Sequence, residues 1–119
     1  MVKKALQIVL LLASVLLIFT ACATYVNIKA EVRHDASAGY FYVENNDSYN
    51  WTDVRLTLNE VYIHTEASIP AGDIRKIADG DFAELDGTRF DFSTTKPLTI
   101  LIECQTPKGT GIYEGSSSN

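Results

Sequence analysis

A long run of apolar residues lies close to the start of the chain. Residues 5–21 are apolar except for three polar side chains, and Lys3 and Lys4 precede them. A basic start, a short apolar stretch and a small-residue end predict an N-terminal export signal. A membrane-spanning helix needs roughly 20 apolar residues, so the length of the run alone leaves an uncleaved span open as an alternative.

The residues that close the run distinguish between these two readings. They are Phe19, Thr20, Ala21 and Cys22. This segment resembles the lipobox of bacterial lipoproteins, in which a large apolar residue and small residues precede a cysteine. The resemblance implies a cut between Ala21 and Cys22, and a diacylglycerol on the Cys22 sulfur that anchors the mature protein with its palmitate chains. The alternative is a simple signal peptide or span that happens to contain a cysteine.

Charge and the residue after Cys22 predict where such a protein resides. Cleavage before Cys22 leaves 98 of the 119 residues and, by removing Lys3 and Lys4, takes the formal charge from −5 to −7. An acidic domain repels nucleic acid and anionic lipid, so we expect no nucleic-acid partner and membrane attachment through the lipid alone. Ala23, rather than aspartate, follows Cys22. This implies the outer membrane in a Gram-negative source and otherwise the outer face of the plasma membrane.

The sequence after residue 22 is typical of β-structure. Short runs of β-branched and aromatic residues alternate with turn signals and show no helical period. About seven strands in about 100 residues predict an all-β fold, an immunoglobulin-like antiparallel β-sandwich, preceded by a helical signal segment. The expected layout is a signal peptide at 1–21, the lipidated cysteine with a first strand or a short stalk at 22–36, the sandwich at 37–114 and a flexible tail at 115–119.

Two of the predicted strands carry specific expectations. Residues 25–33 alternate apolar and polar side chains, which predicts one half-buried strand. In residues 51–65, the apolar residues of 54–58 share one face, but Val61 and Ile63 have the opposite parity. Because side chains alternate with period two, this predicts a bulge or a corner near residues 59–60.

Several short motifs carry a resemblance to a known family. They are residues 43–46, 51–54, 70–72 and 87–90, with Asn59, Tyr62 and Phe82. These motifs resemble small bacterial β-sandwich domains of uncharacterised lipoproteins and, more broadly, immunoglobulin-like modules of the FxLYD type. The F-x-L-Y-D signature itself is replaced by Leu56-Thr57-Leu58-Asn59. The resemblance covers roughly residues 37–114 and implies fold and surface location only, because the family carries no agreed catalytic residues.

No residue pattern predicts a metal, a cofactor or a catalytic centre. The acidic stretch 79–87 lacks the glycine that a calcium loop needs at its sixth position, and His34 and His64 lack a third zinc ligand. Cys104 ends an apolar strand and has no disulfide partner if Cys22 is lipidated. We therefore expect Cys104 to be a buried, inert thiol.

These observations predict a membrane-anchored envelope lipoprotein that is not an enzyme. The leading hypothesis is a module that binds a protein partner of the envelope, or supports an assembly, with strand edges as docking sites. The alternative is a ligand or carbohydrate binder that uses an aromatic loop at Tyr49 and Trp51, although Trp51 at a strand start also fits the core. A hydrolase that joins His34 or His64 to acidic groups is the third hypothesis.

Overall fold

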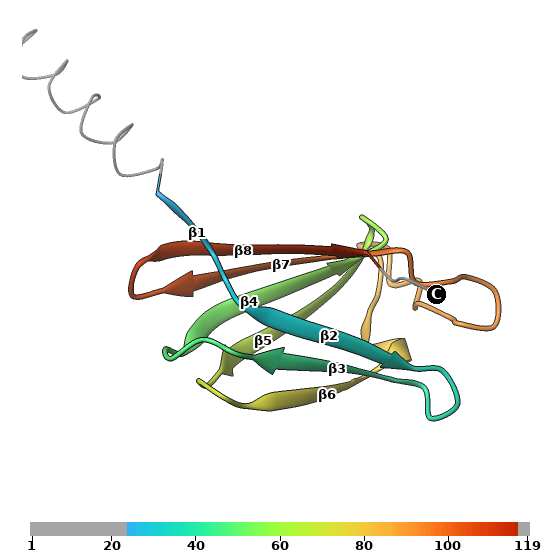
Figure 1. The fold of residues 1–119 in the computed structure, drawn as a ribbon. Coiled ribbons are helices and arrows are strands. Elements are labelled where there is room, and N and C mark those ends of the chain that lie inside the picture. Colours follow the sequence, from blue (N-terminus) through green and yellow to red (C-terminus); the bar gives the residue numbers. More distant parts are fainter. Residues whose placement is uncertain (1–23, 117–119) are drawn as a thin grey trace, which may run out of the picture.

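The chain folds into two β-sheets packed face to face (Figure 1). The computed structural model describes residues 24–116, which contain eight strands, and the predicted all-β sandwich is confirmed. One sheet has the order β1-β8-β7-β4-β5, and the other has the order β2-β3-β6. The elements are β1 (Tyr25–Asn27), β2 (Ala30–Asp35), β3 (Tyr40–Asn45), β4 (Trp51–Leu58), β5 (Tyr62–Ile69), β6 (Ile74–Ala78), the 3-10 turn η1 (Asp79–Asp81), β7 (Thr99–Thr106) and β8 (Gly109–Ser116).

The predicted signal segment, its cleavage point and Cys22 lie outside the described residues. Among residues 24–116, no helix has the length and apolar character needed to cross a membrane.

The first predicted strand is two strands in two different sheets. The alternation expected for residues 25–33 holds, but the chain leaves β1, which pairs in parallel with β8, and enters β2, which pairs antiparallel with β3. Ile28 lies at the joint with 5% of its surface exposed, and its N–H donates to the carbonyl of Ile112 at 3.2 Å. The prediction of one continuous strand was therefore wrong, and this segment belongs to the sandwich rather than to a stalk.

The predicted bulge or corner at residues 59–60 is a hairpin turn. Asn59 and Glu60 have φ values of 50° and 68°, and the N–H of Val61 donates to the carbonyl of Leu58 at 3.2 Å. The chain reverses here, so that β4 and β5 are antiparallel neighbours and Leu58 lies opposite Tyr62. The prediction located the irregularity correctly, but a bulge or corner within one strand was wrong. Val61 lies in the turn and is 45% exposed.

A bulge does occur elsewhere in β4. The register with β7 shifts between Thr52 and Arg55, and Asp53 has a φ of 47°. Asp53 and Val54 together therefore lie opposite the single residue Cys104 of β7. This bulge shifts the alternation of β4 by one residue, so that Trp51 and Val54 are both buried in the core.

The strands β7 and β8 form the centre and one side of the larger sheet. β7 lies between β8 and β4, a central position that suits its sequence, because residues 98–104 are apolar on both faces. β8 continues through Gly115 and Ser116, which pair with Ile100 and Thr99. The first two residues of the predicted tail are thus strand residues, and residues 117–119 lie outside the described part of the chain.

One buried polar residue organises one end of the core. Asn45 is fully buried, and its side-chain amide donates to the carbonyls of Tyr49 at 3.0 Å and Ile69 at 2.9 Å. Its side-chain oxygen accepts the N–H of Asp47 at 2.9 Å. Asn45 therefore satisfies three backbone groups at once and joins the β3–β4 loop to the end of β5.

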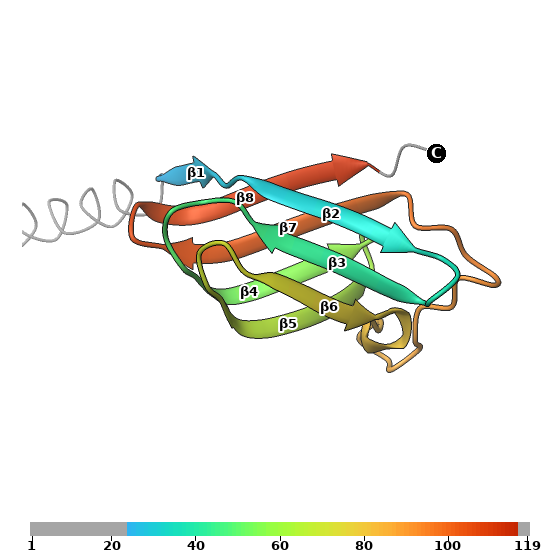
Figure 2. The same cartoon turned by 60° about the horizontal axis from the view of Figure 1, so that its bottom comes forward.

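The sandwich has two ends with different loops (Figures 1 and 2). The proximal pole is the end at which β1 begins. It consists of Thr24 and the loops at residues 28–29, 46–50, 70–73 and 107–108. The distal pole is the opposite end and consists of the loops at 36–39, 59–61 and 79–98. The 79–98 connection, from η1 to the start of β7, is the longest irregular segment between described strands.

Candidate functional site

The aromatic loop considered as a binding site is largely part of the core. Trp51 has no exposed surface, and its indole N–H donates to the Asp47 carboxylate at 3.0 Å. Tyr49 is partly buried, with the Lys108 ammonium 5.5 Å from its ring centre. The core interpretation of Trp51 is confirmed. The Trp51 ring has no exposed face on which a sugar could stack. Of the two aromatic residues proposed to bind carbohydrate, only Tyr49 is partly accessible.

Cys104 is a buried free thiol, as expected. Only 2% of its surface is exposed. Burial, together with the nearby negative charge of Asp47, raises the pKa of the Cys104 thiol to about 11. Since the thiolate is the reactive form, Cys104 is a packing residue and not a nucleophile.

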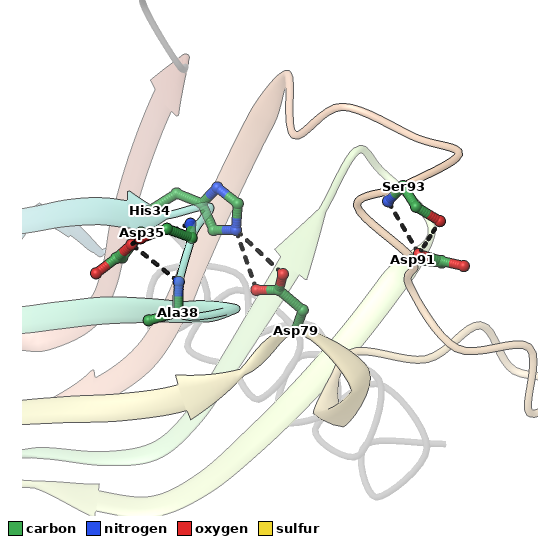
Figure 3. A network of polar contacts seen from close by, with 7 residues as sticks. His34, Asp35, Ala38, Asp79, Asp91 and Ser93 are labelled. Atoms are coloured by element: carbon green, nitrogen blue, oxygen red, sulfur yellow. Dashed lines mark hydrogen bonds and ion pairs between the residues drawn. The ribbon is translucent and has the colours of Figure 1, made fainter.

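The two histidines do not share a site. His34, on β2, contacts both carboxylate oxygens of Asp79 through Nε2, at 3.0 and 3.2 Å (Figure 3). His64, on β5, contacts Glu66 at 3.0 Å. Two phenylalanine rings stand between the histidines in a chain of contacts. The ring centres are 4.3 Å apart for His34–Phe41, 5.1 Å for Phe41–Phe82 and 5.6 Å for Phe82–His64.

A cavity lies beside His34 but is too small for a substrate. It measures about 60 Å³ and is lined by residues from both sheets, among them Val32, Thr99 and Ser116. Ligand sites typically measure 300–1,000 Å³, whereas this space suits one or two water molecules. The pair His34–Asp79 instead holds η1 against β2. The ring of Phe92 also packs on His34, with centres 4.8 Å apart, so this histidine contacts the 79–98 connection at two points, its first residue and Phe92.

Three acidic residues of the 79–98 connection have structural partners, and two of these, Asp86 and Asp91, bond within local turns. Asp79 pairs with His34, Asp86 accepts the N–H of Thr88 at 2.9 Å, and Asp91 accepts from the N–H and hydroxyl of Ser93 at 2.9 and 2.7 Å. Hydrogen bonds from these partners hold the pKa values of Asp86 and Asp91 below the usual value. Across residues 24–116, no three His, Cys, Asp or Glu side chains converge on a point where a metal could bind.

Charge is distributed unevenly between the two poles. The distal-pole loops contain six acidic residues and two basic ones, a formal charge of −4. The proximal-pole loops contain two of each and are formally neutral. The acidic residues of the distal pole are Glu60, Asp79, Asp81, Glu84, Asp86 and Asp91, and its basic residues are Arg89 and Lys96.

The distal pole also exposes apolar side chains. Leu85 is 93% exposed, Leu98 is 62% exposed and Val61 is 45% exposed. Their loops are neighbours. Ile63 and Ala83, two residues before Leu85, bond to each other in both directions, at 2.8 and 3.1 Å. On the other side, the Asn59 side chain accepts the N–H of Leu98 at 2.6 Å.

A broad hollow lies near two of these loops, because Glu60 and Thr99, the sequence neighbours of Val61 and Leu98, line it. It encloses about 550 Å³ on the outer face of the larger sheet, near the β4–β5 turn, and is lined by Thr57, Glu60, Leu101, Glu114 and others. Isolated apolar side chains on a surface are ordinary, but grouped ones rimmed by polar residues mark interaction sites. The exposed side chains and this hollow together form the candidate site.

The sequence contained weak signals for this surface. Leu85 stands between Glu84 and Asp86, outside any alternating run. Leu98 directly follows Pro97 and lies just before β7, which begins at Thr99.

No protein-family model, characterised protein or solved structure matches this chain. The resemblance to lipoproteins and to FxLYD-type modules therefore stays a prediction from the motifs.

Proposed function

We propose that this chain is a lipid-anchored envelope protein that binds a protein partner without catalysis, and that the distal pole is its binding surface. The membrane on which it resides is the outer membrane in a Gram-negative source and the plasma membrane otherwise. The observation that carries the binding role is that three of the five large apolar side chains exposed in residues 24–116, Val61, Leu85 and Leu98, belong to the loops of this one pole.

The chemistry of the pole favours a particular kind of partner. Its loops carry a formal charge of −4. Complementary charge steers association and rejects partners of like charge. Apolar contacts surrounded by polar groups supply the affinity at protein interfaces. The distal pole therefore suits a protein surface that is basic and presents an apolar pocket for Leu85.

Site-specific photocrosslinking in intact membranes tests this proposal. A photoreactive amino acid replaces Leu85 or, as a control, Ala67, which is exposed on β5 away from the pole. We expect a discrete adduct from position 85 and none of that size from position 67. Excess soluble domain should compete for the adduct, whereas domain carrying Leu85→Ser and Leu98→Ser should not.

Two results would count against the proposal. The first is the same set of adducts from positions 67 and 85, which would indicate nonspecific contact. The second is competition by the double serine variant that equals competition by the native domain, which would show that the apolar side chains do not contribute.

A further inference from the structure

The start of the described chain is fixed against the proximal pole. Thr24 packs on the β7–β8 turn so closely that a Cβ added at Gly109 would lie 3.1 Å from both the Thr24 carbonyl oxygen and its Cγ2. Gly109 has a φ of 129°, which favours glycine as well. From Tyr25 onward, β1 is paired with β8.

The joint after β1 is bonded to a second loop of the same pole. The N–H of Lys29 donates to the Asp47 carboxylate at 3.1 Å, and the N–H of Asn46 donates to the Lys29 carbonyl at 2.9 Å. The same Asp47 carboxylate accepts the indole N–H of Trp51. The N-terminal segment is thus held from Thr24 to Lys29 by three separate parts of the domain and has little freedom to swing away.

Covalent geometry then limits how far an anchor on Cys22 can be from this pole. Two residues span at most roughly 7 Å. The polar head-group layer on each side of a bilayer is of similar thickness, about 5–8 Å. An anchor at Cys22 therefore leaves no room for a gap between the β7–β8 turn and the head groups.

The side chains at this pole suit that environment. Tyr25 is 64% exposed, and Lys108 is exposed at the tip of the β7–β8 turn. Tyrosine favours the membrane–water interface because one end of its ring is apolar and the other end is polar. Lysine bonds to phosphate there. The proximal loops are formally neutral, whereas the distal loops carry −4. Anionic lipid would therefore repel the distal pole and not the proximal one.

We infer that the proximal pole is a lipid-contacting surface, in which Tyr25 and Lys108 lie among phospholipid head groups and the distal pole points away from the membrane. The inference rests on the anchor of the proposed function. The eight residues of β8 span roughly 26 Å, so the distal pole stands about that far above the head groups.

Quenching of a fluorescent label by lipids with a nitroxide on the head group tests the orientation. The probe is full-length lipidated protein in phosphatidylethanolamine–phosphatidylglycerol vesicles. Single cysteines replace Pro107 at the proximal pole, Lys76 on the side of the sandwich or Leu85 at the distal pole. Cys104 does not interfere, because it is buried and its thiol stays protonated. We expect several-fold stronger quenching at position 107 than at positions 76 and 85.

The outcomes separate this inference from the proposed anchor. The mass of each preparation is measured first, and protein without lipid on Cys22 would contradict the anchor itself. Lipidated protein with weak quenching at all three positions would overturn the inference, because the domain would stand away from the membrane. Equal quenching at positions 76 and 107 would overturn it too, because the domain would lie on its side.

A paired substitution tests the named side chains. Tyr25→Ser combined with Lys108→Glu should lower the quenching at position 107, whereas Thr65→Ser combined with Lys76→Glu, exposed positions on the sides of the sandwich, should not. Unchanged quenching at position 107 in the Tyr25→Ser, Lys108→Glu variant would show that Tyr25 and Lys108 do not contact lipid.

Discussion

Replacing Asn45 with alanine should strongly destabilise the domain. The substitution leaves the carbonyls of Tyr49 and Ile69 and the N–H of Asp47 without their present partners. A hydrogen bond contributes about 1 kcal/mol net, and more when a buried group is left unpaired, so three bonds amount to about 3 kcal/mol. For a domain of this size, 1 kcal/mol corresponds to roughly 4–8 °C in Tm, which predicts a fall of about 12–24 °C.

Urea unfolding followed by tryptophan fluorescence measures this change, because Trp51 is the one tryptophan and is fully buried. Asn46→Ala is the matched control. Asn46 is the neighbouring residue. Within residues 24–116 its side chain makes no hydrogen bond, and its backbone N–H bond to Lys29 is kept when the side chain is replaced. We expect the midpoint to fall for the Asn45 variant and to change little for the Asn46 variant. A loss below about 1 kcal/mol for Asn45→Ala, or equal losses for both, would refute the role assigned to Asn45.

Three further predictions follow from individual residues. The Cys104 thiol, whose pKa is raised to about 11, should resist iodoacetamide at pH 8 in folded protein and react in urea, as followed by mass spectrometry of the Cys104 peptide; rapid modification of folded protein would contradict its burial. Hydrogen bonds from Ser93 lower the pKa of Asp91, so its contribution to stability is present above pH 3.8 and is lost as the pH falls through the lower folded value. Asp91→Asn keeps an acceptor without a titrating group and should reduce the difference in urea midpoint between pH 7 and pH 3, whereas an unchanged difference would remove Asp91 as a cause. Glu60 adopts a φ of 68°, a conformation that costs a residue with a side chain about 1 kcal/mol; Glu60→Gly should therefore raise the Tm by a few degrees, and a lower Tm would show that the Glu60 side chain stabilises the turn.

The sequence predicted the β-sandwich because burial on one face imposes a period of two. Val43, Leu56 and Ile102 all stand in alternating or doubly apolar runs, and all three are fully buried. The burial of Cys104 could be predicted in the same way, since it alternates with Ile102, whereas Trp51 was placed in the core by its position at a strand start.

The passage of the chain from one sheet to the other could not be predicted from that period. Ile28, directly after β1, and Val32, in β2, pack in the same core although β1 and β2 belong to different sheets. Alternation records which side faces inward and does not record which neighbour supplies the hydrogen bonds. A break between β1 and β2 that preserves parity therefore leaves no trace in the pattern.

The β4–β5 turn was misread for a related reason. At residues 59–60 the apolar side chains change from even-numbered to odd-numbered positions, which fits either a bulge or a reversal of the chain. A tight hairpin turn with two positive-φ residues usually has the sequence Asn-Gly. Here Glu60 stands where glycine is preferred. The distal surface could not be predicted, because the exposure of Leu85 depends on how the 79–98 connection folds. The sequence of that connection has no regular alternation from which its fold could be inferred.

The intact mass of the protein extracted from membranes tests the lipid anchor. We expect a chain that begins at Cys22, carries a diacylglycerol on that sulfur and incorporates labelled palmitate, and we expect Cys22→Ser to abolish the label. A chain that keeps residues 1–21, or one cleaved elsewhere and free of lipid, would contradict the anchor and with it the orientation of both poles. Labelled palmitate retained by the Cys22→Ser variant would show that the lipid is attached at another residue.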